Sequence, residues 1–381
     1  MNFFHRLTER FSKVTPLPEG LHHMQAAHEH ERPFRLHLRL RKDGSGILIV
    51  NAATVLHLNP TAAEYAFHFI KGTDPDEAAK QVSARYRVKK EVALQDFHDF
   101  MDRIQTLIST PDLDPVSYLD FERVAPHSAD LTAPLRLDCA LTYKLPPGTQ
   151  AEYAPAKRVD RELTTDEWKS ILDKAWRAGI PHITFTGGEP TLREDLPALI
   201  AHAESLGQVC GLLSDGLKLA DKEYLHTLLQ TGLDHLLFLL QPDNEKSWKA
   251  LGTVMPEDLF VTVHITVNKE VSPNIPATLE RLAQLGVKSI SVGLADMSLR
   301  SQLDALMQKA ADLNITLAFD LPVPYSAQNP VALETEEDDL PSGAGKVWLY
   351  VEPDGDVLPA QGTADQVLGN FLRDEWEKIY Q

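Results

Sequence analysis

The feature that most constrains the fold is a series of short apolar runs that alternate with amphipathic helical patterns between Leu135 and Pro324. Each run has the length of a buried strand, and strands joined through helices lie parallel, with right-handed crossovers. The expected strands are LRLDCALTY, HITFTGG, QVCGLLS, HLLFLLQ, VTVHITVN, SISVGL and ITLAFDL. Six or seven such units predict an α/β fold, a full or partial (β/α) TIM-like barrel over residues 134–324, whose site lies at the carboxyl ends of the strands.

Residues 34–110 follow a different pattern. FRLHLRL alternates, DGSG supplies a turn, and ILIV and VLHL continue as short strands, which predicts a small antiparallel sheet. A helix that Asn59 or Thr61 can cap is expected through Ile70, ending at Gly72, and a second from about Asp74 to Tyr86. A third helix would place five apolar residues on one face: Phe97, Phe100, Met101, Ile104 and Leu107. This order of elements predicts a winged-helix-like α+β domain.

Three segments flank these two domains: a leader (1–33), a linker rich in Pro and Asp (111–133) and a C-terminal extension (325–381). In the leader, Phe3, Phe4, Leu7 and Phe11 share one face of a short helix, which we expect to pack on the protein's own surface rather than on a membrane. Four histidines follow at spacings that match no usual set of metal ligands. We therefore expect a solvated loop around His22, His23, His28 and His30.

Charge and composition exclude several classes of function. The 381 residues carry a formal net charge of -18 and only two cysteines, Cys139 and Cys210. Nucleic-acid binding relies on Lys and Arg at phosphates, so no nucleic-acid partner is expected. Two cysteines cannot form a disulfide framework or an all-thiolate iron-sulfur site. Because no apolar run approaches the roughly 18 residues of a membrane span and the first residues do not read as a secretory signal, we expect a cytoplasmic protein.

The N-terminal domain carries a first family resemblance. The run VLHLNPTAAEYAFHFIKGTDPDEAAKQV, with Asp96 and a last amphipathic helix after it, resembles the PqqD-like domain of peptide-modifying systems, a recognition element for precursor peptides. The resemblance implies a peptide or protein partner, held as an extra strand between the sheet edge and the third helix. The alternative is that the domain is only a rigid appendage of the barrel.

A sharper resemblance lies in the barrel. ALTYK at 140–144, a loop, a helix from Thr165 and then HITFTGGEPTL at 182–192 resemble the order of elements in peptide-modifying radical SAM enzymes. In that family the GGEP segment holds the methionine end of S-adenosylmethionine. The resemblance implies the same role for Gly187, Gly188, Glu189 and Pro190, and contact of Ser214 and Asp215 with the nucleoside or substrate.

The same resemblance exposes a loss. The family pattern LTYxCxxxCxxCY aligns without a gap on this sequence, and the three cysteine positions hold Leu145, Thr149 and Glu152. The C-terminal segment, SGAGKVWLYVEPDGDVLPAQG, resembles the auxiliary-cluster (SPASM-like) extension of these enzymes, but Ser342 and Ala360 stand where cysteines are expected. Leucine and alanine cannot ligate iron, and one carboxylate does not replace three thiolates. We therefore expect neither cluster.

Other residues have weaker signals. Cys139 and Cys210 lie in strands and are expected to be buried, unreactive thiols. SDG at 214–216 is a ligand contact or an ordinary turn, and His264 and Asn268 are rim contacts, core residues or turn residues. The run ETEEDD at 334–339 is expected to be a solvated loop.

Three hypotheses for function follow. The first is a peptide- or protein-binding pseudoenzyme that can retain S-adenosylmethionine and serve as an accessory in peptide modification. The second is an enzyme with non-radical chemistry at Glu189, Asp215 and Glu152. The third is a radical SAM enzyme with a cluster held by non-standard ligands, which the ligand chemistry disfavours.

Overall fold

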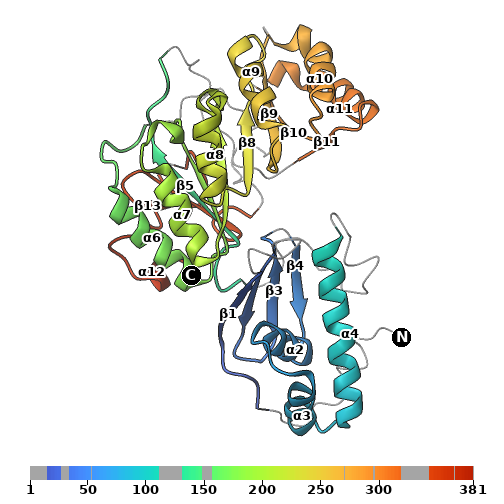
Figure 1. The fold of residues 1–381 in the computed structure, drawn as a ribbon. Coiled ribbons are helices and arrows are strands. Elements are labelled where there is room, and N and C mark those ends of the chain that lie inside the picture. Colours follow the sequence, from blue (N-terminus) through green and yellow to red (C-terminus); the bar gives the residue numbers. More distant parts are fainter. Residues whose placement is uncertain are drawn as a thin grey trace. The chain divides into compact units, whose positions relative to one another are not determined.

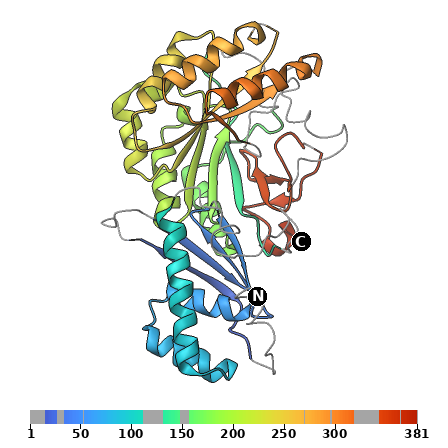
Figure 2. The same cartoon turned by 90° about the vertical axis from the view of Figure 1, so that its right-hand side faces the viewer.

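The computed structural model describes residues 15–26, 34–52, 54–110, 131–147, 157–269, 271–294, 297–318, 343–363 and 365–380. The chain forms two compact units, residues 1–130 and 131–381, and each unit has its own sheet (Figures 1 and 2). The boundaries of the five segments expected from the sequence stay predictions, and the expected linker, 111–133, spans the boundary between the two units. The leader helix that would carry Phe3 to Phe11 lies outside the described residues.

The first unit contains a four-stranded antiparallel sheet. Its strands run in chain order: β1 (Gly20–Gln25), β2 (Arg35–Leu40), β3 (Gly46–Val50) and β4 (Thr54–Leu58). The predicted strands β2 to β4 are confirmed. The predicted loop at His22 and His23 is wrong, since both lie in β1, where His23 pairs with His37 of β2. Backbone pairing with the edge of β2 forms this strand despite its polar sequence. His28 and His30 lie outside the described residues.

Three helices cover one face of this sheet and confirm the prediction. They are α2 (Pro60–Ile70), α3 (Pro75–Tyr86) and α4 (Lys90–Ser109). Asn59 Oδ1 accepts from the backbone N–H of Ala62 at 2.9 Å and caps α2. The core of the unit joins apolar side chains of β2, β3 and β4 to the buried face of α4, where Phe97 and Phe100 pack near Tyr65 of α2.

The second unit is built on a ten-stranded sheet. Seven strands are parallel and adjacent in chain order, from β5 at one side to β11 at an edge of the sheet. They are β5 (Arg136–Thr142), β6 (His182–Gly187), β7 (Val209–Ser214), β8 (His235–Leu239), β9 (Phe260–Val267), β10 (Ser289–Leu294) and β11 (Thr316–Leu317). Within the described residues β11 does not pair with β5, so this α/β sheet is open and fits a partial TIM-like barrel.

Helices alternate with these strands, as predicted. They are α6 (Thr165–Ala178), α7 (Leu196–Leu206), α8 (Lys222–Gln230), α9 (Glu245–Val254), α10 (Ile275–Gln284) and α11 (Leu303–Asp312), with 3-10 turns η2 (Pro190–Leu192), η3 (Leu217–Ala220), η4 (Ser272–Asn274) and η5 (Met297–Gln302). A capping box at Thr164 and Glu167 starts α6. Alternate side chains of each strand pack with these helices into one large core. The side chains between them point to the opposite face of the sheet.

The C-terminal segment adds three more strands to this sheet. They are β12 (Trp348–Val351), β13 (Asp356–Leu358) and β14 (Gly369–Asn370), followed by the short helix α12 (Trp376–Ile379). The predicted hairpin at EPDGDV is confirmed by the antiparallel pairing of β12 with β13. The sequence did not predict that β12 pairs in parallel with β5. The carboxyl end of β12 therefore lies at the same edge of the sheet as the carboxyl ends of β5 to β10.

None of the helices in the described ranges is long and apolar enough to cross a membrane.

Candidate functional site

The candidate site lies where β5, β6 and β7 end side by side. The turn Gly187 to Pro190 follows β6, and Ser214 and Asp215 stand at the end of β7. Because β6 pairs in parallel with both neighbours, these segments lie at the same edge of the sheet. The site is therefore at the edge of the sheet where parallel α/β folds bind ligands.

The two glycines of this turn are required by the chain itself. Gly187 has φ 118°, and a Cβ there would lie 2.3 Å from the carbonyl oxygen of Thr142. A Cβ on Gly188 would lie 2.2 Å from the carbonyl oxygen of Lys144. The N–H of Gly188 donates to Thr142 O at 2.6 Å, and that of Glu189 donates to Lys144 O at 2.7 Å. The glycines thus allow the turn to pack on the backbone that follows β5.

The buried side chain of Glu189 joins the turn after β6 to the end of β7 through hydrogen bonds. Its side chain is 1% exposed and accepts four hydrogen bonds. Oε1 accepts from Thr191 N (2.9 Å), Thr191 Oγ1 (2.5 Å) and Ser214 Oγ (2.9 Å), and Oε2 accepts from Asp215 N (2.8 Å). Burial, then repulsion from Asp215, raises the pKa of Glu189 to about 8, while donors on Thr191 and Asp215 oppose the rise. Both oxygens accept hydrogen bonds from the protein, Oε2 only one, and the expected bond from Glu189 to a ligand ammonium stays a prediction.

Three polar atoms near the strand ends lack a hydrogen-bond partner among the described residues. They are Tyr143 Oη, Thr186 Oγ1 and Asp215 Oδ2, and all three are buried. They lie just after β5, within β6 and at the end of β7, which are adjacent strands. Buried polar atoms in native proteins nearly always have partners, and bare ones mark a place for water or a ligand. Tyr143 Oη, Thr186 Oγ1 and Asp215 Oδ2 are therefore polar groups that water or a ligand would have to satisfy.

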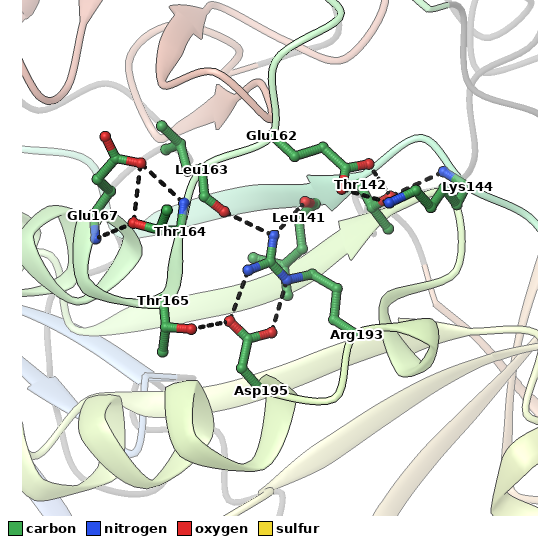
Figure 3. A network of polar contacts seen from close by, with 10 residues as sticks. All are labelled: Leu141, Thr142, Lys144, Glu162, Leu163, Thr164, Thr165, Glu167, Arg193 and Asp195. Carbon is green, nitrogen blue, oxygen red and sulfur yellow. Dashed lines mark hydrogen bonds and ion pairs between the residues drawn. The ribbon is translucent and has the colours of Figure 1, made fainter.

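Hydrogen bonds connect Thr142 and Lys144, which precede the segment with Leu145, Thr149 and Glu152, to Glu162, which follows it (Figure 3). Glu162 accepts from Thr142 Oγ1 at 2.6 Å and from Lys144 Nζ at 2.9 Å, and Thr142 Oγ1 also accepts from Lys144 N at 3.0 Å. Lys144 precedes the segment and Glu162 follows it. Side-chain bonds thus join the two ends of the segment that binds a cluster in the radical SAM pattern.

Arg193 extends this network to the GGEP turn (Figure 3). Its Nη1 donates to the carbonyl oxygens of Leu141 (3.2 Å) and Leu163 (3.0 Å). Nε and Nη2 bind Asp195 in a bidentate pair at 2.8 and 2.7 Å, and Asp195 also accepts from Thr165 Oγ1 at 2.6 Å. Arg193 and Asp195 were not predicted from the sequence. An Arg-x-Asp spacing directly after GGEPTL was the available signal.

Of the degenerate cluster positions, Leu145 and Ala360 lie in the described ranges, and neither side chain can ligate a metal. Leu145 is half-buried and Ala360 is 4% exposed, and Thr149, Glu152 and Ser342 lie outside the described residues. Both cysteines are buried inside strands, and burial raises the pKa of Cys139 well above its ordinary value. The described ranges hold no group of three or more His, Cys, Asp or Glu residues that could bind a metal ion. This donor set does not fit an iron-sulfur cluster.

The other candidate residues have structural roles. Ser214 Oγ donates to Glu189 and accepts from Gly216 N at 3.0 Å. His264 is 1% exposed inside β9 rather than at the rim, where Nδ1 contacts Ser291 Oγ (3.1 Å) and Nε2 contacts Thr266 Oγ1 (3.3 Å). Asn268 Oδ1 accepts from Val271 N at 2.7 Å and stabilises a turn. The core and turn readings are therefore the ones that the structure supports for these residues.

Glu352 directly follows β12. It was not predicted from the sequence as a site residue. The residue is 4% exposed, and its Oε2 has no hydrogen-bond partner among the described residues. Burial, followed by repulsion from Asp354 and Asp356, raises the pKa of Glu352 to about 8. The structure thus places a proton-binding carboxyl group at the edge of the sheet that carries the candidate site.

This pKa predicts a pH-dependent stability. Between the ordinary carboxyl pKa and about 8, the folded chain keeps a proton on Glu352 that the unfolded chain has lost. Stability therefore falls as pH rises through this window. In Glu352→Gln, we expect the urea midpoint to fall less from pH 5 to pH 8 than in the wild type. A wild-type and a variant profile that run parallel would contradict this role of Glu352.

The chain is similar to known proteins over part of its length. Residues 139–263 match the model of the radical SAM superfamily. The chain is similar to PqqA peptide cyclases, with 26% identity over 261 residues to that of Granulibacter bethesdensis and 28% over 231 residues to that of Streptomyces rochei. These matches cover 59% and 53% of this chain and 67% and 62% of the two relatives. The chain thus matches about three fifths to two thirds of their length.

Solved structures extend the likeness of fold to most of the chain. Streptococcus suis SuiB bound to the precursor peptide SuiA has a TM-score of 0.59 at 15% identity, covering 90% of this chain and 87% of that one. SuiB bound to S-adenosylmethionine also has a TM-score of 0.59 at 15% identity, with 91% and 87% coverage. Residues 139–263 are therefore similar to the radical SAM superfamily domain, and the α/β fold of the chain is similar to that of SuiB.

Proposed function

We propose that the chain is a cluster-less relative of the peptide-modifying radical SAM enzymes that binds a peptide and S-adenosylmethionine without radical chemistry. The observation that carries this proposal is the donor set: Leu145 and Ala360 stand at two expected ligand positions, and both thiols are buried in strands. A protein that lacks the thiolates has no means to hold the cluster that reduces S-adenosylmethionine. The turn at Gly187 to Pro190 nevertheless keeps its place at the strand ends.

The peptide partner is assigned to the N-terminal unit, which we interpret as a PqqD-like winged-helix domain. Among the described strands β4 pairs only with β3, so its other edge is open, and α4 runs alongside β4 (Figure 1). An open edge offers backbone donors and acceptors to an added peptide strand. The similarity to PqqA peptide cyclases and to SuiB, solved with a precursor peptide, supports a peptide as the class of partner.

S-adenosylmethionine is assigned to the ends of β5, β6 and β7. The bare atoms of Tyr143, Thr186 and Asp215 fit a polar ligand, and SuiB has been solved with S-adenosylmethionine. The bound molecule would supply an adenosyl group, a sulfonium and an amino-acid head. Residues of this chain would bind and orient it, while Glu189 would hold the turn.

The alternative of non-radical catalysis has weaker support. Its expected polar groups were Glu189, Asp215 and Glu152, but Glu189 already accepts four hydrogen bonds within the protein and Glu152 lies outside the described residues. We therefore prefer an accessory role in peptide modification. The SPASM-like nature of the C-terminal segment and the cytoplasmic location stay predictions.

Peptide selection followed by hydrogen exchange tests the peptide part of the proposal. The full chain is used to select linear peptides from a displayed random library, with the PqqA peptide as a defined probe. We expect a bound peptide to protect the amides of β4 and of the flank of α4 beside it. The amides of β1, at the opposite edge of the same sheet, serve as the internal control. Failure to select a binder, or protection at β1 instead of β4, would contradict the assignment.

A further inference from the structure

The side chain of Glu352 lies on the face of the sheet opposite the helices. The parallel pairing of β12 with β5, continued by one residue, places Glu352 beside Ala140 of β5. On its other side, the N–H of Glu352 donates to Asp356 O at 2.8 Å. Tyr350, two residues before Glu352, packs with Ala140 and Leu358. Because side chains alternate along a strand, Glu352 points to the same face as this apolar group.

One carboxyl oxygen of Glu352 is buried without a hydrogen-bond partner. The residue is 4% exposed, and its Oε2 has no partner among the described residues. The arginines near the adjoining hairpin contact Asp356: Arg158 Nη2 lies 2.7 Å from Oδ2, and Arg373 Nη2 lies 3.5 Å from Oδ1. A buried polar atom without a partner is unfavourable, so water or a ligand has to satisfy Glu352 Oε2.

The charges around Glu352 favour a cation over an anion. Burial, followed by repulsion from Asp354 and Asp356, raises the pKa of Glu352 to about 8. The potential at this carboxyl group is therefore negative, in a chain whose formal net charge is -18. A positively charged donor would offset the repulsion and form a charge-assisted hydrogen bond with Oε2.

We propose that Glu352 Oε2 binds the ammonium group of a lysine side chain of the peptide partner. Because the acceptor is a single oxygen, it suits the point charge of an ammonium better than the planar guanidinium of arginine, which binds carboxylates through two oxygens. The apolar side chains of Ala140, Tyr350 and Leu358, on the same face, suit the methylene stem of lysine. On binding, Glu352 releases its proton to solvent, so that a carboxylate meets the ammonium.

This inference rests on the proposed peptide binding, and it names one side chain that the peptide supplies. It does not require S-adenosylmethionine. A small lysine derivative therefore tests the Glu352 site separately from the edge of β4, to which the peptide backbone is assigned.

Calorimetric titration of the full chain with Nα-acetyl-lysine methylamide tests the site. The norleucine counterpart keeps the methylene stem and lacks the ammonium. We expect the lysine compound to bind roughly tenfold to a hundredfold more tightly than the norleucine compound, the range of a charge-assisted hydrogen bond. Because Glu352 is mostly protonated at pH 7, binding should release about one proton. Titrations in phosphate and in Tris, whose heats of ionisation differ, measure this proton.

Three variants assign the effect to residues. Glu352→Gln keeps the size of the side chain and should weaken the lysine compound roughly tenfold or more, with no proton release. Asp354→Asn removes one repelling charge, so fewer protons should be released at pH 7. Glu377→Gln removes an exposed acid of the same C-terminal segment and should bind the lysine compound like the wild type.

The outcomes separate this inference from the proposed function. No binding of the lysine compound, equal affinity for the norleucine compound, no proton release, or an unchanged affinity in Glu352→Gln would overturn the lysine site. If a selected peptide protects β4 while the lysine compound fails, the lysine site alone is overturned. If the lysine compound binds as expected and no peptide is selected, the cation site stands and the peptide as its source is overturned.

Discussion

Glu189→Ala is expected to lower the free energy of unfolding by about 3 kcal/mol. The substitution leaves buried hydrogen-bond donors without an acceptor, and each such donor costs about 1–3 kcal/mol. Those donors are Thr191 N, Thr191 Oγ1, Ser214 Oγ and Asp215 N. The change also releases the contact between the GGEP turn and the end of β7. Urea denaturation at pH 7, followed by circular dichroism, measures the loss.

The exposed Glu194 provides the matched control for this change. Glu194→Ala should alter the free energy of unfolding by no more than about 0.5 kcal/mol, as is usual for surface positions. If Glu189→Ala lowers the free energy of unfolding by less than about 1 kcal/mol, the four hydrogen bonds contribute little, and Glu189 does not hold the turn to the end of β7.

Arg193→Met is expected to cost about 2–4 kcal/mol, since it removes bonds to two carbonyl oxygens and breaks a partly buried ion pair. The guanidinium joins Leu141 at the end of β5, Leu163 before α6 and Asp195 at the start of α7. Hydrogen exchange should show faster opening at these three places together. The exposed Arg177, with the same substitution, is the control and should lie near the wild type. If exchange rises at only one of the three places, Arg193 does not connect them.

Much of the fold was predictable because its periodic patterns are strong. The runs that became β5 to β10 are apolar and separated by helices, and α2 to α4 carry clear caps or apolar faces. β1 was missed because a strand of Gly20–Gln25 with two histidines has no apolar alternation, and only its pairing with β2 forms it. The parallel pairing of β12 with β5 joins segments about 200 residues apart in the chain, and no local pattern encodes such a contact.

The candidate site was predictable in position but not in detail. GGEP at the end of a predicted strand placed the turn correctly. The hydrogen bonds of Glu189 to Ser214 and Asp215 could not be predicted, because these partners come from the next strand, 25 and 26 residues later. The lack of a hydrogen-bond partner for Asp215 Oδ2 could not be predicted either, because it depends on the residues that surround the side chain in the folded protein. Such tertiary hydrogen bonds determine how much acceptor capacity each carboxyl group keeps for a ligand.

The central claim is that this chain keeps the radical SAM fold and works without an iron-sulfur cluster, and anaerobic reconstitution tests it most directly. Iron and sulfide are assayed and the visible absorption is recorded after desalting, with Leu145→Cys/Thr149→Cys/Glu152→Cys as the comparison that restores three thiols. The account predicts that the wild type retains far less than one iron per chain, shows no charge-transfer band near 400 nm and takes up less iron than the triple variant. A wild type with stoichiometric iron, sulfide and that band would contradict it.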